Sequence, residues 1–230
     1  MPVPRTRKRR IPSLKKKDTN PHLRTITVRG TSKGKDTEGR IHYGRVFLGL
    51  DPSLRGFGRA AVCENGALMH YPTLRGGAKL KGMKRFAYLL DELRNDLLQI
   101  VHCAKTGLYK GLVVVREDYA IHANDAADTP LKELGGALEW FLYQMEIPLY
   151  RLNITSIKKF ATGRGDTDKT KVPDIVNRRF GFNGDEDAAH AFAAAITALS
   201  VVNRDKIEGT DEPMREVIGA LAGHPLTKVG

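Results

Sequence analysis

The chain has little of what marks secreted or membrane proteins. Only two of its 230 residues are cysteine, Cys63 and Cys103, and neither belongs to a CxxC pair, so the sequence offers neither a disulfide framework nor a cysteine zinc site. No run approaches the roughly 18 apolar residues that a membrane span needs, and the N-terminus lacks the apolar core of a secretory signal. We therefore expect a cytoplasmic protein without a membrane partner, whose cysteines are small core side chains.

Acidic residues are scarce at the N-terminal end. Residues 1–45 contain 14 Lys/Arg and 3 Asp/Glu, whereas the other 185 residues contain 24 and 23. A proline-interrupted stretch such as RTRKRRIPSLKKK cannot bury apolar surface, so residues 1–44 are predicted to form a flexible basic arm that neutralises phosphates. The DNA contacts predicted there are Arg7, Lys8, Arg9 and Arg10. A solubilising tail, a nuclear-type address and an organelle presequence remain alternatives for this charge run.

The remainder, residues 45–230, has the patterns of one α/β domain. RVFLGLD reads as a first strand, and GRAAVCENGALMHY reads as two more strands joined by a turn at Asn65–Gly66. LVVVRED and IPLYRLN are the fourth and fifth strands. A mixed sheet of five strands flanked by helices is therefore expected.

Helical periodicity fills the intervals between these strands and the region after them. Apolar residues recur at helical spacing from Leu80 to Val101, and residues 130–145 also look helical, with Trp140 and Phe141 expected inside. Further helices are predicted in ITSIKKFATGRG, in KTKVPDIVNRRFGF and in the alanine-rich DEDAAHAFAAAITALSVV. Residues 211–226 are a candidate C-terminal helix, which serves either dimerisation or packing.

Acidic side chains end two of the predicted strands. A lone Asp after a strand is usually a turn cap, but Asp51 ends the first strand, Glu117 ends the fourth, and Asp187 and His190 share one face of the alanine-rich helix. If the two strands are neighbours, these four side chains meet in one cleft. Adjacent carboxylates raise one another's pKa, so such a cluster is expected to hold divalent cations. Two ions about 3.5–4 Å apart are the arrangement that drives phosphodiester hydrolysis.

Five blocks in register carry a resemblance to a known family. They are FLGLDPSLRGFGRAAV, VVVREDYAI, LKELGGALEWFL, ITSIKKFATGRGDTDK and DEDAAHAFAAAIT. In this order and at these separations they resemble the RuvC family of Holliday junction resolvases, particularly its bacteriophage-type members, over roughly residues 45 to 203. The resemblance implies a ribonuclease H-like fold, a homodimer, and paired nicking of four-way DNA junctions with Mg²⁺ or Mn²⁺, two ions per active site. A phage protein would act in the cytoplasm of its host cell.

The resemblance also implies roles for the acidic cluster. Asp51 would bridge both metals, Glu117 would be the fourth-strand acid, and Asp187 would take the first acidic place in the family's final helix motif. His190 falls where many members carry the last Asp, and because histidine is softer than carboxylate it suits Mn²⁺ better than Mg²⁺. Asp185 lies two residues from Asp187 and would face away in a regular helix.

Basic and aromatic residues near the cluster are candidate DNA contacts. Lys169 resembles the family's basic residue near the scissile phosphate, with an ordinary helix-start lysine as the alternative. Lys158, Lys159 and Arg164 are predicted to contact the DNA backbone. Tyr119, followed by His122, lies where the family places an aromatic wedge for the junction centre, and a core-facing tyrosine is an equal alternative.

Two other functions stay open beside a structure-selective endonuclease. A ribonuclease H-type hybrid nuclease would carry a catalytic Glu on its first helix, where this chain offers only Asp91 and Glu92 without a comparable motif. A junction-binding protein without catalysis is favoured by a histidine at position 190. GRGDTDKT resembles a phosphate-binding P-loop, but Asp168 occupies the place of the glycine before the lysine, so no nucleotide cofactor is expected.

Overall fold

The computed structural model describes residues 27–28, 34–35, 41–70, 72–75, 80–105, 109–118, 125–222 and 227–229. Most of the predicted basic arm, including its four candidate DNA contacts, lies outside the described residues. Tyr119 and His122 lie outside them too. Within the described part, no helix is long and apolar enough to cross a membrane.

A mixed sheet forms the centre of the fold, in the order β10-β8-β7-β4-β5-β6. Its strands are β4 (Arg45–Asp51), β5 (Gly58–Cys63), β6 (Leu68–His70), β7 (Gly111–Glu117), β8 (Leu149–Leu152) and β10 (Thr227–Val229). β4, β5 and β6 form an antiparallel meander, β7 runs parallel to both β4 and β8, and β10 is antiparallel to β8. The five predicted strands are present, and the predicted turn places Gly66 at a φ of 80°.

The sixth strand corrects the prediction of a five-stranded sheet. The C-terminal helix, expected over 211–226, is α6 (Glu212–Ala222), and the chain then adds β10 beside β8. Three residues are too short to show a strand period, so the pairing is determined by the free edge of β8 rather than by local sequence.

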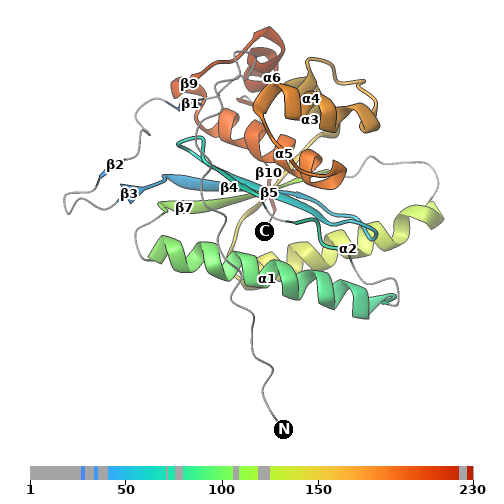
Figure 1. Cartoon of the computed structure of the whole chain (residues 1–230). Helices are drawn as coiled ribbons and strands as arrows, with labels where there is room; N and C mark the ends of the chain where they lie inside the picture. Colours follow the sequence, from blue (N-terminus) through green and yellow to red (C-terminus); the bar gives the residue numbers. More distant parts are fainter. Residues whose placement is uncertain are drawn as a thin grey trace.

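Helices cover both faces of the sheet (Figure 1). α1 (Met83–Lys105) and α2 (Asp125–Gln144) lie on one face. The other face carries α3 (Ile154–Thr162), α4 (Val172–Phe180), α5 (Glu186–Val202) and α6. The described chain also contains the short pairs β1 (Thr27–Val28) with β9 (Ile207–Glu208) and β2 (Gly34–Lys35) with β3 (Ile41–His42), and the 3₁₀ turns η1 (Lys169–Lys171) and η2 (Arg204–Lys206).

Three side chains differ from the sequence-based expectation. Trp140 was expected inside α2 but is 66% exposed, because Leu134, Leu138 and Leu142 form the buried stripe of that helix. Met83, which belongs to the apolar spacing predicted from Leu80 to Val101, lies at the start of α1 and is 72% exposed. Of the two cysteines, Cys63 is buried as expected, whereas Cys103 is only half-buried.

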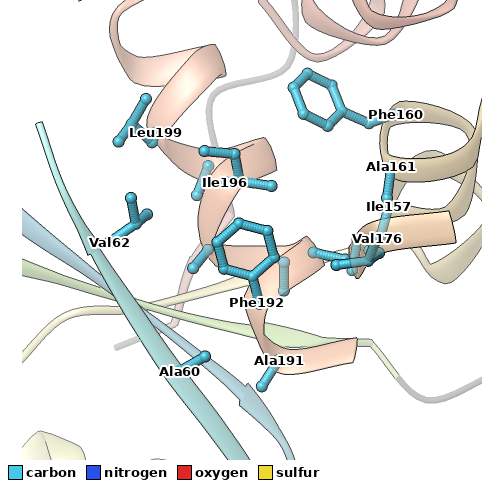
Figure 2. Packing of buried hydrophobic residues seen from close by; sticks show 14 of the residues in the cluster. Ala60, Val62, Ile157, Phe160, Ala161, Val176, Ala191, Phe192, Ile196 and Leu199 are labelled. Carbon is cyan, nitrogen blue, oxygen red and sulfur yellow. The ribbon is translucent and has the colours of Figure 1, made fainter. Parts of the chain in front are cut away.

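Helix α5 packs directly on β4 and β5. Every residue from Ala188 to Val201 is buried, and eight of these are alanine or serine, so the helix backbone can approach the sheet closely. A Cβ added at Gly49 of β4 would overlap the carbonyl oxygen of Ala191. Figure 2 shows Phe192 of α5 filling the space between Ala60 and Val62 on the sheet and Val176 on α4.

Adding one methyl group at this contact tests how closely the helix must approach. We expect Gly49→Ala to lower the free energy of unfolding by about 3 kcal/mol, because the new Cβ meets backbone that cannot move aside. The measurement is urea denaturation followed by circular dichroism. Gly219→Ala on α6 is the matched control, since its Cβ meets nothing within 4 Å and should stabilise the helix by roughly 0.5–1 kcal/mol. Equal effects of both substitutions would contradict the close contact.

Candidate active site

Two acids lie at the same edge of the sheet. Asp51 is the last residue of β4 and Glu117 is the last residue of β7. The strands are parallel neighbours, and Leu50 pairs with Arg116, one residue before each acid. Because alternate residues of a strand point to opposite faces, Asp51 and Glu117 share the face covered by α5. The predicted meeting of the two acid-tipped strands is therefore present in the fold.

The beginning of α5 brings two further residues to this edge. Asp187 lies in the first turn of the helix, and His190 follows one turn later, 2% exposed. A Cβ at Gly56 would overlap the carboxylate of Asp187, and one at Gly58 would overlap its backbone carbonyl. Glycine at both positions thus lets the loop after β4 and the start of β5 lie against Asp187.

Burial raises the pKa values of the three carboxyl groups. It raises the pKa of Asp51 to about 6, with Asp187 and Glu186 adding to the effect and Lys169 opposing it. The pKa of Glu117 rises to about 7, first through burial and then through the charge of Asp51. Burial also raises the pKa of Asp187. The three carboxyl groups are thus held where a negative charge is unfavourable unless a cation offsets it.

One carboxylate oxygen is left without a donor. Asp51 Oδ2 is buried and has no hydrogen-bond partner among the described residues. Lys169 Nζ lies 3.9 Å from it, beyond hydrogen-bonding distance. Buried acceptors are normally satisfied, so this oxygen fits a site for a cation. As the side chains stand, however, no three His, Cys, Asp or Glu residues in the described ranges are grouped closely enough to hold a metal ion.

His190 is buried in its neutral form. Burial, together with the nearby charge of Lys169, lowers its pKa to about 4. Its Nε2 lies 3.4 Å from the carbonyl oxygen of Lys169. With the proton on Nε2, the ring donates to this carbonyl and leaves the lone pair of Nδ1 for another partner. Neutral imidazole is the form that binds metals.

The predicted basic contacts fall into two groups. The charges of Lys169 and Lys158 lower the pKa of Glu117, so both lie near the acids. Lys159 instead forms an ion pair with Glu216 of α6. Arg164 pairs with Asp166 through two hydrogen bonds, of 2.8 and 3.0 Å, in the loop after α3.

Sequence reasoning missed a basic residue on the other side of the site. Asp185, expected to face away from Asp187, is the N-cap of α5 and accepts hydrogen bonds from Ala188 N, from Thr73 and from Arg75. Arg75 also lowers the pKa of Asp187. The only signal in the sequence was a basic residue after the third strand, and nothing local connects it to a helix 110 residues away in the chain.

The raised pKa values predict that the metal-free protein loses stability as pH rises. Between about pH 4 and pH 6 the folded protein keeps a proton on Asp51 that the unfolded chain has released, so unfolding is favoured through this window. Asp51→Asn should therefore be more stable than wild type at pH 8, by up to roughly 3 kcal/mol, with the difference shrinking toward pH 4.

Urea denaturation in EDTA across this pH range measures the difference. Asp91→Asn, at an exposed carboxylate of α1, is the matched control and should follow the wild-type pH profile. A less stable Asp51→Asn variant at pH 8 would contradict the expectation.

Comparisons with known proteins agree with these observations. No family model matches the chain. A protein of Baumannia cicadellinicola subsp. Homalodisca coagulata, named crossover junction endodeoxyribonuclease RuvC, is 27% identical over 154 residues, 66% of this chain and 85% of its own. A protein of the same name from Caldicellulosiruptor saccharolyticus is 26% identical over 157 residues, 65% of this chain and 89% of its own.

Two solved structures share the fold. Thermus thermophilus RuvC aligns with a TM-score of 0.55 and 17% identity, over 71% of this chain and 98% of its own. T. thermophilus RuvC in complex with a Holliday junction substrate aligns with a TM-score of 0.56 and 15% identity, over the same shares. The expected ribonuclease H-like fold is thus confirmed. The chain is similar in sequence to proteins named crossover junction endodeoxyribonuclease RuvC and similar in fold to two RuvC structures, in agreement with the resemblance of its five sequence blocks.

Proposed function

We propose that this protein is a structure-selective DNA endonuclease that resolves branched DNA, chiefly four-way junctions. The observation that carries the proposal is the pair of acids at the ends of β4 and β7, Asp51 buried and Glu117 half-buried, with Asp187 of α5 beside them and one oxygen of Asp51 without a donor. The RuvC names of the sequence relatives and the junction-bound structural neighbour support it.

The site fits divalent cations in its chemistry. Asp51, Glu117 and Asp187 supply the hard oxygen ligands that Mg²⁺ and Mn²⁺ prefer, and His190 supplies an imidazole. Because no three of these groups converge as they stand, holding two ions requires Asp187 and His190 to turn toward the strand acids. When bound, the ions would activate a water molecule and stabilise the leaving oxygen.

The protein's own residues prepare the site for a phosphodiester. Asp51 is buried and Glu117 half-buried, so water solvates their carboxylates poorly, and a bound cation would offset the charges that burial disfavours. Lys169, 3.9 Å from Asp51, is positioned to pair with the scissile phosphate, and Lys158 stands near Glu117. Cleavage would leave 5′-phosphate and 3′-hydroxyl ends. We also propose that Tyr119 is the aromatic wedge for the junction centre and that the basic arm, residues 1–44, binds the flanking duplex.

Paired cuts on symmetric strands require two active sites, so we propose a homodimer. Trp140 and Tyr143 of α2 are 66% and 65% exposed and lie three residues apart on one helix face. Large exposed aromatics on a helix are typical of protein contacts. We assign this face of α2 to the contact between two copies.

The assignment predicts that Trp140→Glu separates the dimer. A buried charge at the contact should raise the dimer dissociation constant at least tenfold, measured by analytical ultracentrifugation. Paired cuts in one junction should then give way to single nicks. Leu98→Glu, at a 48% exposed leucine on α1, should leave the dimer intact. An undisturbed dimer in the Trp140 variant would refute the assignment.

A junction-binding protein without catalysis is the second candidate. The observation that favours it is that, among the described residues, no three potential ligands are grouped to hold a metal. It would bind junctions as tightly as the nuclease and leave them uncut. A ribonuclease H-type enzyme has less support, since Asp91, on the helix where that class carries its Glu, is exposed. From the bacteriophage-type resemblance we further propose that the protein is of phage origin and acts in the cytoplasm of the host cell.

Cleavage of a synthetic four-way junction in Mg²⁺ and separately in Mn²⁺ tests the function. We expect paired symmetric nicks that fall at least 100-fold in Asp51→Asn, because that carboxylate is the central ligand. His190→Asp should shift the preference from Mn²⁺ toward Mg²⁺, since an oxygen ligand replaces imidazole. Linear duplex and an RNA/DNA hybrid are the control substrates. Tight junction binding with no nicks in either metal would establish the binding protein, and cleavage of the hybrid alone would establish the ribonuclease H-type enzyme.

A further inference from the structure

We infer that Arg75 is a phosphate-binding residue for the DNA strand, held beside the active site by Asp185 until the strand arrives. The inference rests on the proposed function and adds to it a contact on the side of the site opposite Lys158. It concerns the segment 72–75, which follows β6, and the N-cap of α5. Three properties of Arg75 support it. Its backbone is anchored to the sheet, its ion-pair partner Asp185 can release it, and it lies in a row of cations.

The backbone next to Arg75 is hydrogen-bonded to the loop that precedes β5. Leu74, the preceding residue, is 5% exposed and pairs with Phe57 through two backbone hydrogen bonds, of 2.8 and 2.9 Å. Phe57 lies between Gly56 and Gly58, the two glycines that pack on Asp187. The backbone of Arg75 is therefore anchored next to the catalytic acids, although its side chain is 65% exposed.

The partner of Arg75 can release it. Arg75 Nη2 lies 3.0 Å from Asp185 Oδ2, and this is the one hydrogen-bonded ion pair of Arg75 among the described residues. Asp185 also accepts hydrogen bonds from Ala188 N and from the Thr73 hydroxyl. The carboxylate thus stays satisfied, and α5 stays capped, when the arginine turns away. Ion pairs at exposed positions contribute little, whereas guanidinium binds phosphate through two parallel hydrogen bonds.

Arg75 completes a row of cations along the acidic edge. The neighbouring strands β7, β4 and β5 carry Glu117, Asp51 and the glycine that packs on Asp187. Lys158 stands near Glu117, Lys169 near Asp51, and Arg75 beyond Asp187. A strand whose scissile phosphate lies over the acids would extend toward Lys158 on one side and Arg75 on the other. Its flanking phosphates would then meet a cation in both directions.

Salt-dependent binding of the full chain tests the inference. In an Asp51→Asn background, which prevents cutting, Arg75→Gln should weaken binding to a four-way junction roughly three- to tenfold. The slope of log K against log salt should become shallower by about 0.7–0.9, the loss of one phosphate contact. Arg75→Lys should keep the slope, because it keeps the charge.

Asp185→Asn separates a phosphate contact from a structural ion pair. Both Asp185→Asn and Arg75→Gln break the pair, and asparagine retains the helix cap. If Arg75 binds phosphate, Asp185→Asn binds DNA as tightly as its parent or tighter. If Arg75 only holds α5, both variants lose thermal stability together and neither changes the slope, which would overturn the inference. Arg94→Gln, at an exposed arginine of α1, is the matched control and should change nothing.

The outcomes separate this inference from the proposed nuclease. If the wild-type protein cuts junctions and Arg75→Gln leaves the salt slope of the Asp51→Asn background unchanged, the phosphate contact alone is refuted. If the wild-type protein binds junctions but never cuts them, and Arg75→Gln makes the slope shallower, the contact is supported and the nuclease is refuted. If the wild-type protein binds no DNA, both are refuted.

Discussion

The close contact of α5 with β4 and β5 is the constraint on which the rest of the structure depends. The helix carries Asp187 and His190, the strand β4 carries Asp51, and Gly49 lets the two backbones meet where any side chain would intervene. The alanines of α5 permit the same approach from the helix side. A helix held farther away by larger residues would leave Asp187 remote from Asp51, so packing of the core determines whether the acids form one site.

The same contact places like charges in a buried position. Folding buries Asp51, partly buries Glu117 and raises their pKa values to about 6 and 7, which opposes stability at neutral pH. The large apolar clusters on both sheet faces supply the compensating free energy. This conflict between local electrostatics and global packing is expected where a site must attract cations, because an acid already satisfied by protein donors would bind them poorly.

Much of the fold and part of the site could be predicted from the sequence. Apolar runs that end in Asp51 and Glu117 identify both the strands and the edge at which the two acids meet, since parallel neighbours expose the same ends. Trp140 was misplaced because an aromatic residue within an apolar helix looks buried, and only the leucine stripe of α2 decides otherwise. The partnership of Arg75 with Asp185 and the pairing of β10 with β8 join residues distant in sequence. No local pattern encodes such contacts.

The end of β7 shows how one strand serves both faces of the sheet. Glu117 points to the α5 face, so Arg116 points to the opposite face, where it is 2% exposed and bonds Glu139 of α2 at 2.6 Å. Arg116 Nη1 also donates to the backbone carbonyl of Glu117 at 3.0 Å, which fixes the peptide that carries the acid. Removing one member of a buried pair leaves an unpaired charge. Because Glu139 precedes Trp140 in α2, the acidic edge and the face assigned to a second copy are connected through the ion pair between buried Arg116 and half-buried Glu139.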